Sequence, residues 1–381
     1  MKSSFYVFLG CEFDRPPPIN YQYLPHHLQK YGNVLCVEYP QFINLFKILT
    51  MRLSFIERKS IKLDILHYFG LLPFGRSIKT FNKINHLLNY RLSKKLFTDE
   101  DREKIIISFT PELILLNKKI LSEPNIFYYV IDDFSNNPMW SSQLQQKQYN
   151  FLEDKMLSIS KGVITSSIIL FKKYKKLHHN VFYFSNPSDS LPFLRYKANI
   201  NTIPQDLKKI TKPIIGFAGS LYIWRVDLNL IDYITDSLND YSFVFIGHLT
   251  KSDIYSYKKI FKKRNCHYLG FKNHIDLPKY IDHFDVSIIP YKLHNYGKAC
   301  FPVKIYEHLA MGKPIVTTAL PSIKHLSDQG IISWARNKIE FKNYILAELN
   351  KEKNNKIDIK KRLALENSWE NRIQDFIKII S

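Results

Sequence analysis

The sequence predicts an α/β protein built from two doubly wound parallel sheets, and three observations support this fold class. Short apolar runs alternate with longer amphipathic stretches along the chain, as strands and helices do in such sheets. The apolar runs restart after a polar, proline-containing stretch at 195–213, which indicates a second sheet. A length of 381 residues is enough for two domains that each bury a core.

Each expected strand is a short apolar run. The first half, taken as a domain at 1–200, carries six: Phe5–Leu9, Val34–Glu38, Ile105–Ser108, Ile126–Ile131, Gly162–Thr165 and Val181–Phe184. The second half, taken as a domain at 201–360, carries five: Ile214–Ala218, Phe243–Gly247, Cys266–Leu269, Val286–Pro290 and Ile315–Thr318. Helical patterns lie between them, for example at 21–31 and 139–159. The tail, 361–381, carries one apolar helical stripe that Ser368 is placed to cap.

The composition is that of a folded, basic protein. Lysine and arginine total 55 against 34 acidic residues, a net charge of +21, which predicts attraction to an anionic partner such as nucleic acid, lipid headgroups or phosphorylated small molecules. The lysines are dispersed and form no known nucleic-acid module, which argues against nucleic acid. The cysteines (Cys11, Cys36, Cys266 and Cys300) are scattered, as expected for reduced thiols of a cytoplasmic protein. No apolar run approaches the roughly 18 residues that span a bilayer.

The stretch "FPVKIYEHLAMGKPIVTT" at 301–318 has the features of a short helix followed by a buried strand. Pro302 suits the first turn of a helix, and Gly312 suits the residue just past its end. Lys304 and Glu307 then lie one turn apart near the positive end of the helix.

A helix start with a lysine can bind a diphosphate, and the carboxylate one turn later can accept both vicinal hydroxyls of a ribose. Each such charge-assisted hydrogen bond contributes about 1.5–3 kcal/mol. The alternative is an exposed ion pair worth about 0.2–0.5 kcal/mol. Because ligands of doubly wound sheets bind beyond the carboxyl ends of strands, the position of Lys304 and Glu307 favours a nucleoside diphosphate.

Two other loops of the second half follow predicted strands. In "GSLYIWRVD", Gly219 permits a close backbone approach, Arg225 brings positive charge, and Asp227 can cap a helix beginning near Leu228. The alternative is a simple strand-to-helix turn. His248 follows the next strand, where the alternative to a ligand contact is a solvated loop histidine.

In the first half, Asp132 and Asp133 end a strand in "YYVIDDFSNNP". Two adjacent carboxylates repel each other, so we expect one pKa to rise, which suits a general base. The alternative is turn and cap chemistry, and each aspartate can serve one purpose.

These motifs together resemble glycosyltransferases of the two-domain GT-B fold, in particular those that build bacterial surface polysaccharides such as teichuronic acid and xanthan. The resemblance is strongest in "FPVKIYEHLAMGKPIVTT" and continues in "IGFAGSLYIWRVDLNL", "YLGFKNHIDLPKYIDHFDVSIIPY" and "ENSWENRIQDF". It implies two Rossmann-like domains facing a cleft, with a nucleotide-sugar donor on the second domain, an acceptor on the first, and the tail helix packed back onto the first.

The resemblance also implies functional residues. Lys304 would hold the diphosphate and Glu307 the ribose. The nucleobase of the donor would lie against the loop after Leu269. The donor-contacting positions expected in this way are Gly219, Ser220, Arg225, His248, Lys304, Tyr306 and Glu307. Many retaining relatives carry a second glutamate where this chain has Ala299, which favours inversion with Asp132 or Asp133 as the base.

We expect no cofactor and no metal, because Lys304, Arg225 and helix termini can supply the positive charge. The Asp99-Glu100-Asp101 run is read as a solvated loop rather than a magnesium site.

The expected activity is transfer of a sugar, from UDP by the habit of the family, to a lipid-linked or growing polysaccharide of the cell envelope. The stretch 44–69 mixes large apolar and basic residues, which suggests peripheral binding to the inner face of the cell membrane. The alternative for this stretch is an amphipathic helical hairpin over the first sheet. Alternatives for the activity are a sugar-nucleotide epimerase of the same fold and a donor-binding pseudoenzyme.

Overall fold

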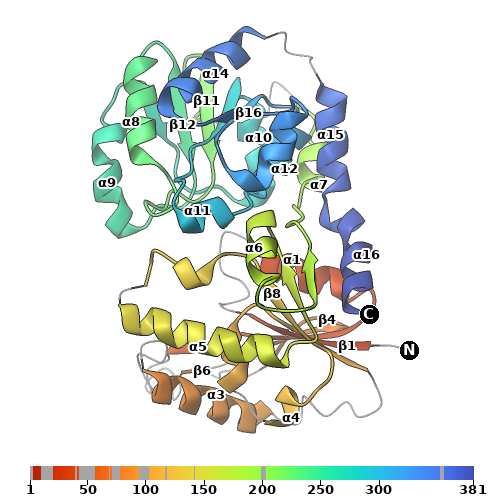
Figure 1. Cartoon of the computed structure of the whole chain (residues 1–381). Helices are drawn as coiled ribbons and strands as arrows, with labels where there is room; N and C mark the ends of the chain where they lie inside the picture. Colours follow the sequence, from red (N-terminus) through yellow and green to blue (C-terminus); the bar gives the residue numbers. More distant parts are fainter. Residues whose placement is uncertain are drawn as a thin grey trace. The chain divides into compact units, whose positions relative to one another are not determined.

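The computed structural model describes residues 3–9, 20–38, 41–42, 56–67, 69–70, 78–93, 103–115, 118–140, 142–198, 203–351 and 356–381. The chain divides into two compact units (Figure 1). The first unit comprises Met1–Ser185 with Ile373–Ser381, and the second comprises Asn186–Arg372. The boundary after Ser185 comes earlier in the chain than the boundary after residue 200 that the sequence suggested.

The first unit contains a sheet of eight described strands in the order β10-β9-β8-β7-β1-β2-β5-β4. Every neighbouring pair is parallel except β4 and β5, which are antiparallel. The strands are β1 (Ser3–Phe8), β2 (Gly32–Val37), β4 (Ile56–Ser60), β5 (Leu63–Leu66), β7 (Lys104–Ser108), β8 (Ile126–Val130), β9 (Gly162–Thr165) and β10 (Val181–Tyr183). Two short strands, β3 (Gln41–Phe42) and β6 (Phe69–Gly70), pair separately.

Helices connect these strands, and serine caps fix where two of them begin. Ser142 accepts a hydrogen bond from the Gln145 backbone at the start of α5, and Ser167 accepts one from Leu170 at the start of α6. The helices and 3-10 turns of the first unit are α1 (Asn20–Leu28), α3 (Lys79–Ser93), η2 (Pro111–Leu115), α4 (Lys118–Leu121), η3 (Phe134–Asn136), α5 (Gln143–Ile159) and α6 (Ile168–Tyr174).

The second unit contains six described strands in the order β13-β12-β11-β14-β15-β16, and every neighbouring pair is parallel. The strands are β11 (Ile214–Ala218), β12 (Ser242–Ile246), β13 (Cys266–Tyr268), β14 (Val286–Ile289), β15 (Ile315–Thr318) and β16 (Ser333–Ala335). Strands β12 and β13 lie on one side of β11, and β14, β15 and β16 lie on its other side. The order in which strands are added to the sheet therefore reverses between β11 and β14. In such sheets that point is the usual ligand position.

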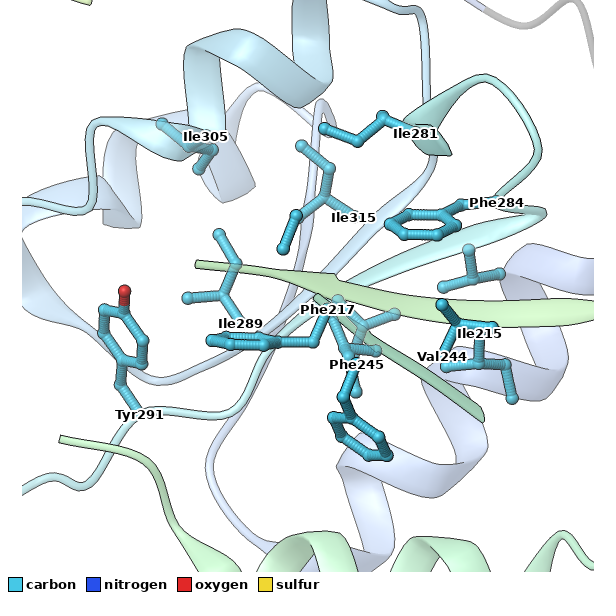
Figure 2. Close-up of a cluster of buried hydrophobic side chains, with 14 of the residues drawn as sticks. Ile215, Phe217, Val244, Phe245, Ile281, Phe284, Ile289, Tyr291, Ile305 and Ile315 are labelled. Carbon is cyan, nitrogen blue, oxygen red and sulfur yellow. The ribbon is translucent and has the colours of Figure 1, made fainter. Parts of the chain in front are cut away.

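The helices of the second unit follow the strands in alternation. They are α7 (Leu191–Arg195), α8 (Leu228–Ser237), α9 (Lys251–Phe261), η5 (His274–Asp276), α10 (Leu277–Ile281), α11 (Asn295–Ala299), α12 (Lys304–Ala310), η6 (Pro321–Ile323), α13 (Lys324–Asp328), α14 (Lys338–Asn350) and α15 (Ile357–Glu366). Figure 2 shows side chains of the central strands, including Phe217 and Ile315, together with Ile305 of α12 in one buried cluster. This core holds α12 against the carboxyl ends of the strands.

The fold class is confirmed. Each of the eleven predicted strands is present within one or two residues, because most are buried on both faces and are therefore continuously apolar. The predicted cap at the start of α8 is also present, since the Asp227 carboxylate accepts from the Leu230 backbone at 3.1 Å.

The helical interpretation of 44–69 is wrong for its described part. Residues 44–55 and 68 lie outside the described residues, whereas Ile56–Ser60 and Leu63–Leu66 form the antiparallel pair β4–β5. Leu63, Ile65 and Leu66 are buried, and most of β4 is exposed. The mixture of apolar and basic residues therefore reflects a hairpin at a sheet edge with one face in solvent.

The tail stripe belongs to α16 (Trp369–Ile380). Trp369, Ile373, Phe376 and Ile380 are each at most 2% exposed. The ring of Phe376 lies 5.7 Å from that of Tyr129 in β8, and Ile373–Ser381 is part of the first unit.

The segment before 195 packs within the second unit. Phe193 of α7 is 1% exposed and belongs to the core of that unit. The Ser190 hydroxyl donates to the Ala364 carbonyl of α15 at 2.9 Å. These contacts explain why the boundary precedes the polar stretch at 195–213.

Candidate active site

The stretch 301–318 folds as a short helix with defined ends, followed by a strand. Helix α12 begins at Lys304, and the Ile305 backbone donates to the Pro302 carbonyl at 3.0 Å, so Pro302 stands just before the helix rather than in its first turn. The helix ends at Ala310, and Gly312 has φ +69°, the left-handed geometry expected just past a helix.

The ammonium of Lys304 lies where the strand order reverses, near the ends of β11 and β14. Its Nζ is 4.2 Å from the ring centroid of Phe217 at the end of β11 and 5.3 Å from that of Tyr291, which follows β14. A Cβ added at Gly219, whose φ is +144°, would lie 1.8 Å from this Nζ. Glycine suits position 219 because this φ strains any other residue, and an added side chain would also displace the lysine ammonium.

This ammonium is buried, and among the described residues it has no hydrogen-bond partner. Burial lowers the pKa of Lys304 to about 7, with the nearby positive charge of Arg225 as a further cause. The two aromatic rings offset only part of the lost hydration. A cation kept in this way, without an internal anion bonded to it, is suited to receive an anionic ligand.

Arg225 brings a second positive charge from the loop after β11. Its guanidinium carbon is 4.7 Å from the ring centroid of Trp224 and 5.7 Å from that of Tyr291. Backbone bonds fix the loop: Arg225 donates to the Tyr222 carbonyl at 2.9 Å and accepts from the Lys292 backbone at 2.8 Å. Lys304 and Arg225 thus flank the ring of Tyr291.

Two glycines let the carboxyl ends of β11 and β12 approach closely. Gly247 has φ +148°, and a Cβ there would lie 1.9 Å from the Gly219 carbonyl oxygen. Ser220 is half-buried beside Gly219. His248 is exposed, with its ring 6.1 Å from that of Tyr222 and its carbonyl bonded to the Leu221 backbone at 2.9 Å.

Glu307 lies one turn along α12 and holds a partner that sequence reasoning missed. The Nε2 atom of His274 is 3.0 Å from Glu307 Oε1, and its Nδ1 atom is 3.6 Å from Asp189 Oδ2. Burial acts to raise the pKa of Glu307, but the hydrogen bond and charge of His274 outweigh it and lower that pKa. The available signal for His274 was its place in the loop after Leu269, beyond a predicted strand.

Two further residues near the motif are packed rather than exposed. Tyr306 is 2% exposed, and its ring stacks on Phe301 at 5.8 Å. Ala299 is 0% exposed at the end of α11, so its side chain belongs to the core.

Asp133, in the first unit, is an ion-paired structural carboxylate. It accepts from Lys173 at 2.7 Å, from Ser135 at 2.7 Å and from Asn136 at 2.8 Å. Burial acts to raise the pKa of Asp133, but these donors outweigh it and lower that pKa. The pKa rise expected for one of the two aspartates is therefore not at Asp133, whose bonds to Ser135 and Asn136 are those of a turn. Asp132 is half-buried at the carboxyl end of β8.

The first unit also contains a cavity of about 180 Å³ at α3, η2 and α5. Trp140 and Tyr149 provide aromatic walls, and Asn82, Glu112 and Gln148 contribute polar atoms. Apolar walls with a few polar groups are typical of small-molecule sites.

The described residues contain no candidate metal site and no candidate membrane span. Asp99, Glu100 and Asp101 lie outside the described residues. Within the described ranges, no group of three or more His, Cys, Asp or Glu side chains is arranged to hold a metal ion. None of the described helices is both long and apolar enough to cross a bilayer.

Known proteins resemble this chain in sequence and in fold. Residues 212–351 match the family model described as "Glycosyl transferases group 1". A segment of 259 residues is 24% identical to TuaH of Bacillus subtilis (strain 168), which is described as a teichuronic acid biosynthesis glycosyltransferase; the match spans 66% of this chain and 64% of that protein.

Solved structures resemble the chain over nearly its whole length. Sucrose-phosphate synthase from Thermosynechococcus elongatus is 12% identical with a TM-score of 0.74, covering 99% of this chain and 98% of the other. HepE from Anabaena, solved in complex with UDP-glucose, is 16% identical with a TM-score of 0.69, covering 98% of each. The chain therefore has the GT-B fold, and residues 212–351 of its second unit resemble the glycosyl transferases group 1 family.

Proposed function

We propose that this protein is a glycosyltransferase that moves a sugar from a UDP-sugar donor to a lipid-linked or growing surface polysaccharide. The observation that carries the proposal is the buried Lys304 ammonium at the switch between β11 and β14, with no internal hydrogen-bond partner among the described residues. A diphosphate is the ligand that supplies the missing acceptors. The UDP complexes of HepE and the description of TuaH support the choice of donor and pathway type.

The chemical task is departure of the nucleoside diphosphate from a sugar that gains oxocarbenium character. Positive charge placed beforehand at the leaving phosphate lowers this barrier, and loss of one such group typically costs about 3–4 kcal/mol. Lys304 and Arg225 supply that charge, while Gly219 and Ser220 let the backbone approach the phosphates. On this proposal the transfer needs no metal ion and no cofactor.

The remaining donor contacts follow from the same frame. Glu307 accepts hydrogen bonds from the vicinal hydroxyls of the ribose. His248 contacts the donor from the loop after β12, and the nucleobase lies against the loop after Leu269. Tyr306 serves the site by packing under α12, because its ring is almost wholly buried against Phe301.

For the acceptor we propose inversion with Asp132 as the base that deprotonates the attacking hydroxyl. Ala299 takes the position where retaining relatives carry a glutamate, and Asp133 is engaged by Lys173. The cavity lined by Trp140, Tyr149 and Glu112 supports acceptor binding in the first unit.

An epimerase or a pseudoenzyme of the same fold would use the same donor contacts. Incubation with UDP-sugars and no acceptor separates the three functions. Slow release of free sugar and UDP supports a transferase, conversion of one UDP-sugar to another indicates an epimerase, and tight binding without turnover indicates a pseudoenzyme.

Replacing Lys304 by alanine is expected to weaken UDP binding at least tenfold, because the substitution removes the buried cation that contacts the diphosphate. Isothermal titration calorimetry measures the effect. Lys298→Ala, which changes an exposed lysine of α11, is the matched control and is expected to bind UDP normally. Unchanged affinity in Lys304→Ala would remove the donor site from this position.

The two aspartates are expected to differ. Asp132→Asn should reduce turnover at least 100-fold with donor affinity unchanged, in line with the roughly 10²–10⁴-fold contribution of a general base. Asp133→Asn should lower the thermal midpoint, because it weakens the bond from Lys173. Turnover by both variants at the natural rate would place the base elsewhere.

We also propose peripheral association with an anionic membrane surface, supported by the net charge of +21. In the β4–β5 hairpin, Arg58 and Lys59 already pair with Asp64 and Glu57, so the support rests on the chain as a whole. Sedimentation with vesicles rich in anionic lipid is expected and should weaken with salt. Equal binding to neutral vesicles would contradict this.

A further inference from the structure

His274 stands between two carboxylates that come from different parts of the second unit. Its Nε2 atom meets Glu307 of α12 at 3.0 Å, and its Nδ1 atom faces Asp189, in the segment between β10 and α7, at 3.6 Å. The edge of its ring packs against Phe193 of α7, with centroids 5.1 Å apart. The side chains of His274, Glu307 and Asp189 are 14–26% exposed, so the contacts between them are largely shielded from solvent.

Glu307 accepts a hydrogen bond from the ring, whereas Asp189, at 3.6 Å, acts on it through its charge, so both carboxylates favour the protonated imidazole. Burial acts to lower the pKa of His274, but the hydrogen bond and charge of Glu307, with the charge of Asp189, outweigh it and raise that pKa. Asp276, in the same 3-10 turn, is bonded to Lys279 at 2.7 Å instead. The charge of Lys304, on the same helix, also acts to lower the pKa of Glu307.

We propose that His274 is a positioning residue whose imidazolium fixes the Glu307 carboxylate for the vicinal hydroxyls of a bound ribose, while Asp189 holds the imidazolium at its other nitrogen. This inference rests on the proposed donor site. A carboxylate offers about four lone-pair positions, so one bond from His274 leaves acceptors for two hydroxyls.

The arrangement gives His274 a measurable signature that differs from that of Lys304. Positioning of Glu307 affects only the contact with the ribose hydroxyls, whereas Lys304 affects the diphosphate. The ratio of the affinities for UDP and 2′-deoxy-UDP isolates the ribose contact, because both ligands carry the same diphosphate and the contribution of Lys304 cancels.

The test is calorimetric measurement of this ratio in the full chain and its variants. The natural protein is expected to prefer UDP over 2′-deoxy-UDP at least tenfold near pH 6.5. His274→Leu is expected to reduce the preference below threefold, as Glu307→Gln does. The matched control is His267→Leu, a half-buried histidine of β13, which is expected to keep the natural preference.

The pH dependence tests the charge on the ring. His274 is charged below its raised pKa, so the preference for UDP is expected to fall as pH rises through that pKa. His274→Gln supplies a neutral donor and should restore part of the preference without this pH dependence. Asp189→Asn should shift the fall to lower pH, and it gives the same test should the histidine variants fold poorly.

Two results would overturn the proposal. A natural preference for UDP retained by His274→Leu, in a chain that still needs Lys304 for UDP binding, would refute the positioning role alone. Absence of UDP binding by the natural chain would refute the proposed donor site and the positioning role with it.

Discussion

The ammonium of Lys304 is buried between the rings of Phe217 and Tyr291 and against the backbone of Gly219. Much of the local structure serves this placement. Helix α12 starts at the lysine, β11 and β14 are neighbours in the sheet, and Gly219 leaves room for the ammonium. The placement costs hydration, as the pKa of about 7 indicates, and an anionic ligand would recover that cost.

The carboxylates of the chain divide according to the partners they have. Asp133 is bonded to Lys173, Ser135 and Asn136, and this network shapes the turn after β8. Among the described residues, the Glu307 side chain is hydrogen-bonded to one histidine and keeps further acceptor positions. A carboxylate engaged by three internal donors stabilises structure, whereas one with more acceptor positions left over can bind a ligand. This contrast separates Asp133 from Glu307.

The sequence predicted eleven of the fourteen described strands of the two sheets because strands buried on both faces are continuously apolar, as in "IFYYV" and "IIGFA". Gly312 located the end of α12 and Asp227 located the cap of α8, because both signals are local. The β4–β5 hairpin was missed because a half-exposed edge has a mixed pattern that helices share. His274 and Lys173 were missed because they meet their partners 33 and 40 residues away, a distance over which local patterns carry no information.

Proton uptake on UDP binding is the most direct measurement of the central claim. With a pKa of about 7 in the free protein, Lys304 is mostly neutral at pH 8. A bound diphosphate would restore its charge, so UDP binding should take up protons at that pH, as calorimetry in buffers of different ionisation enthalpy can measure. The account predicts this uptake and its loss in Lys304→Met. Binding of UDP without proton uptake would contradict it.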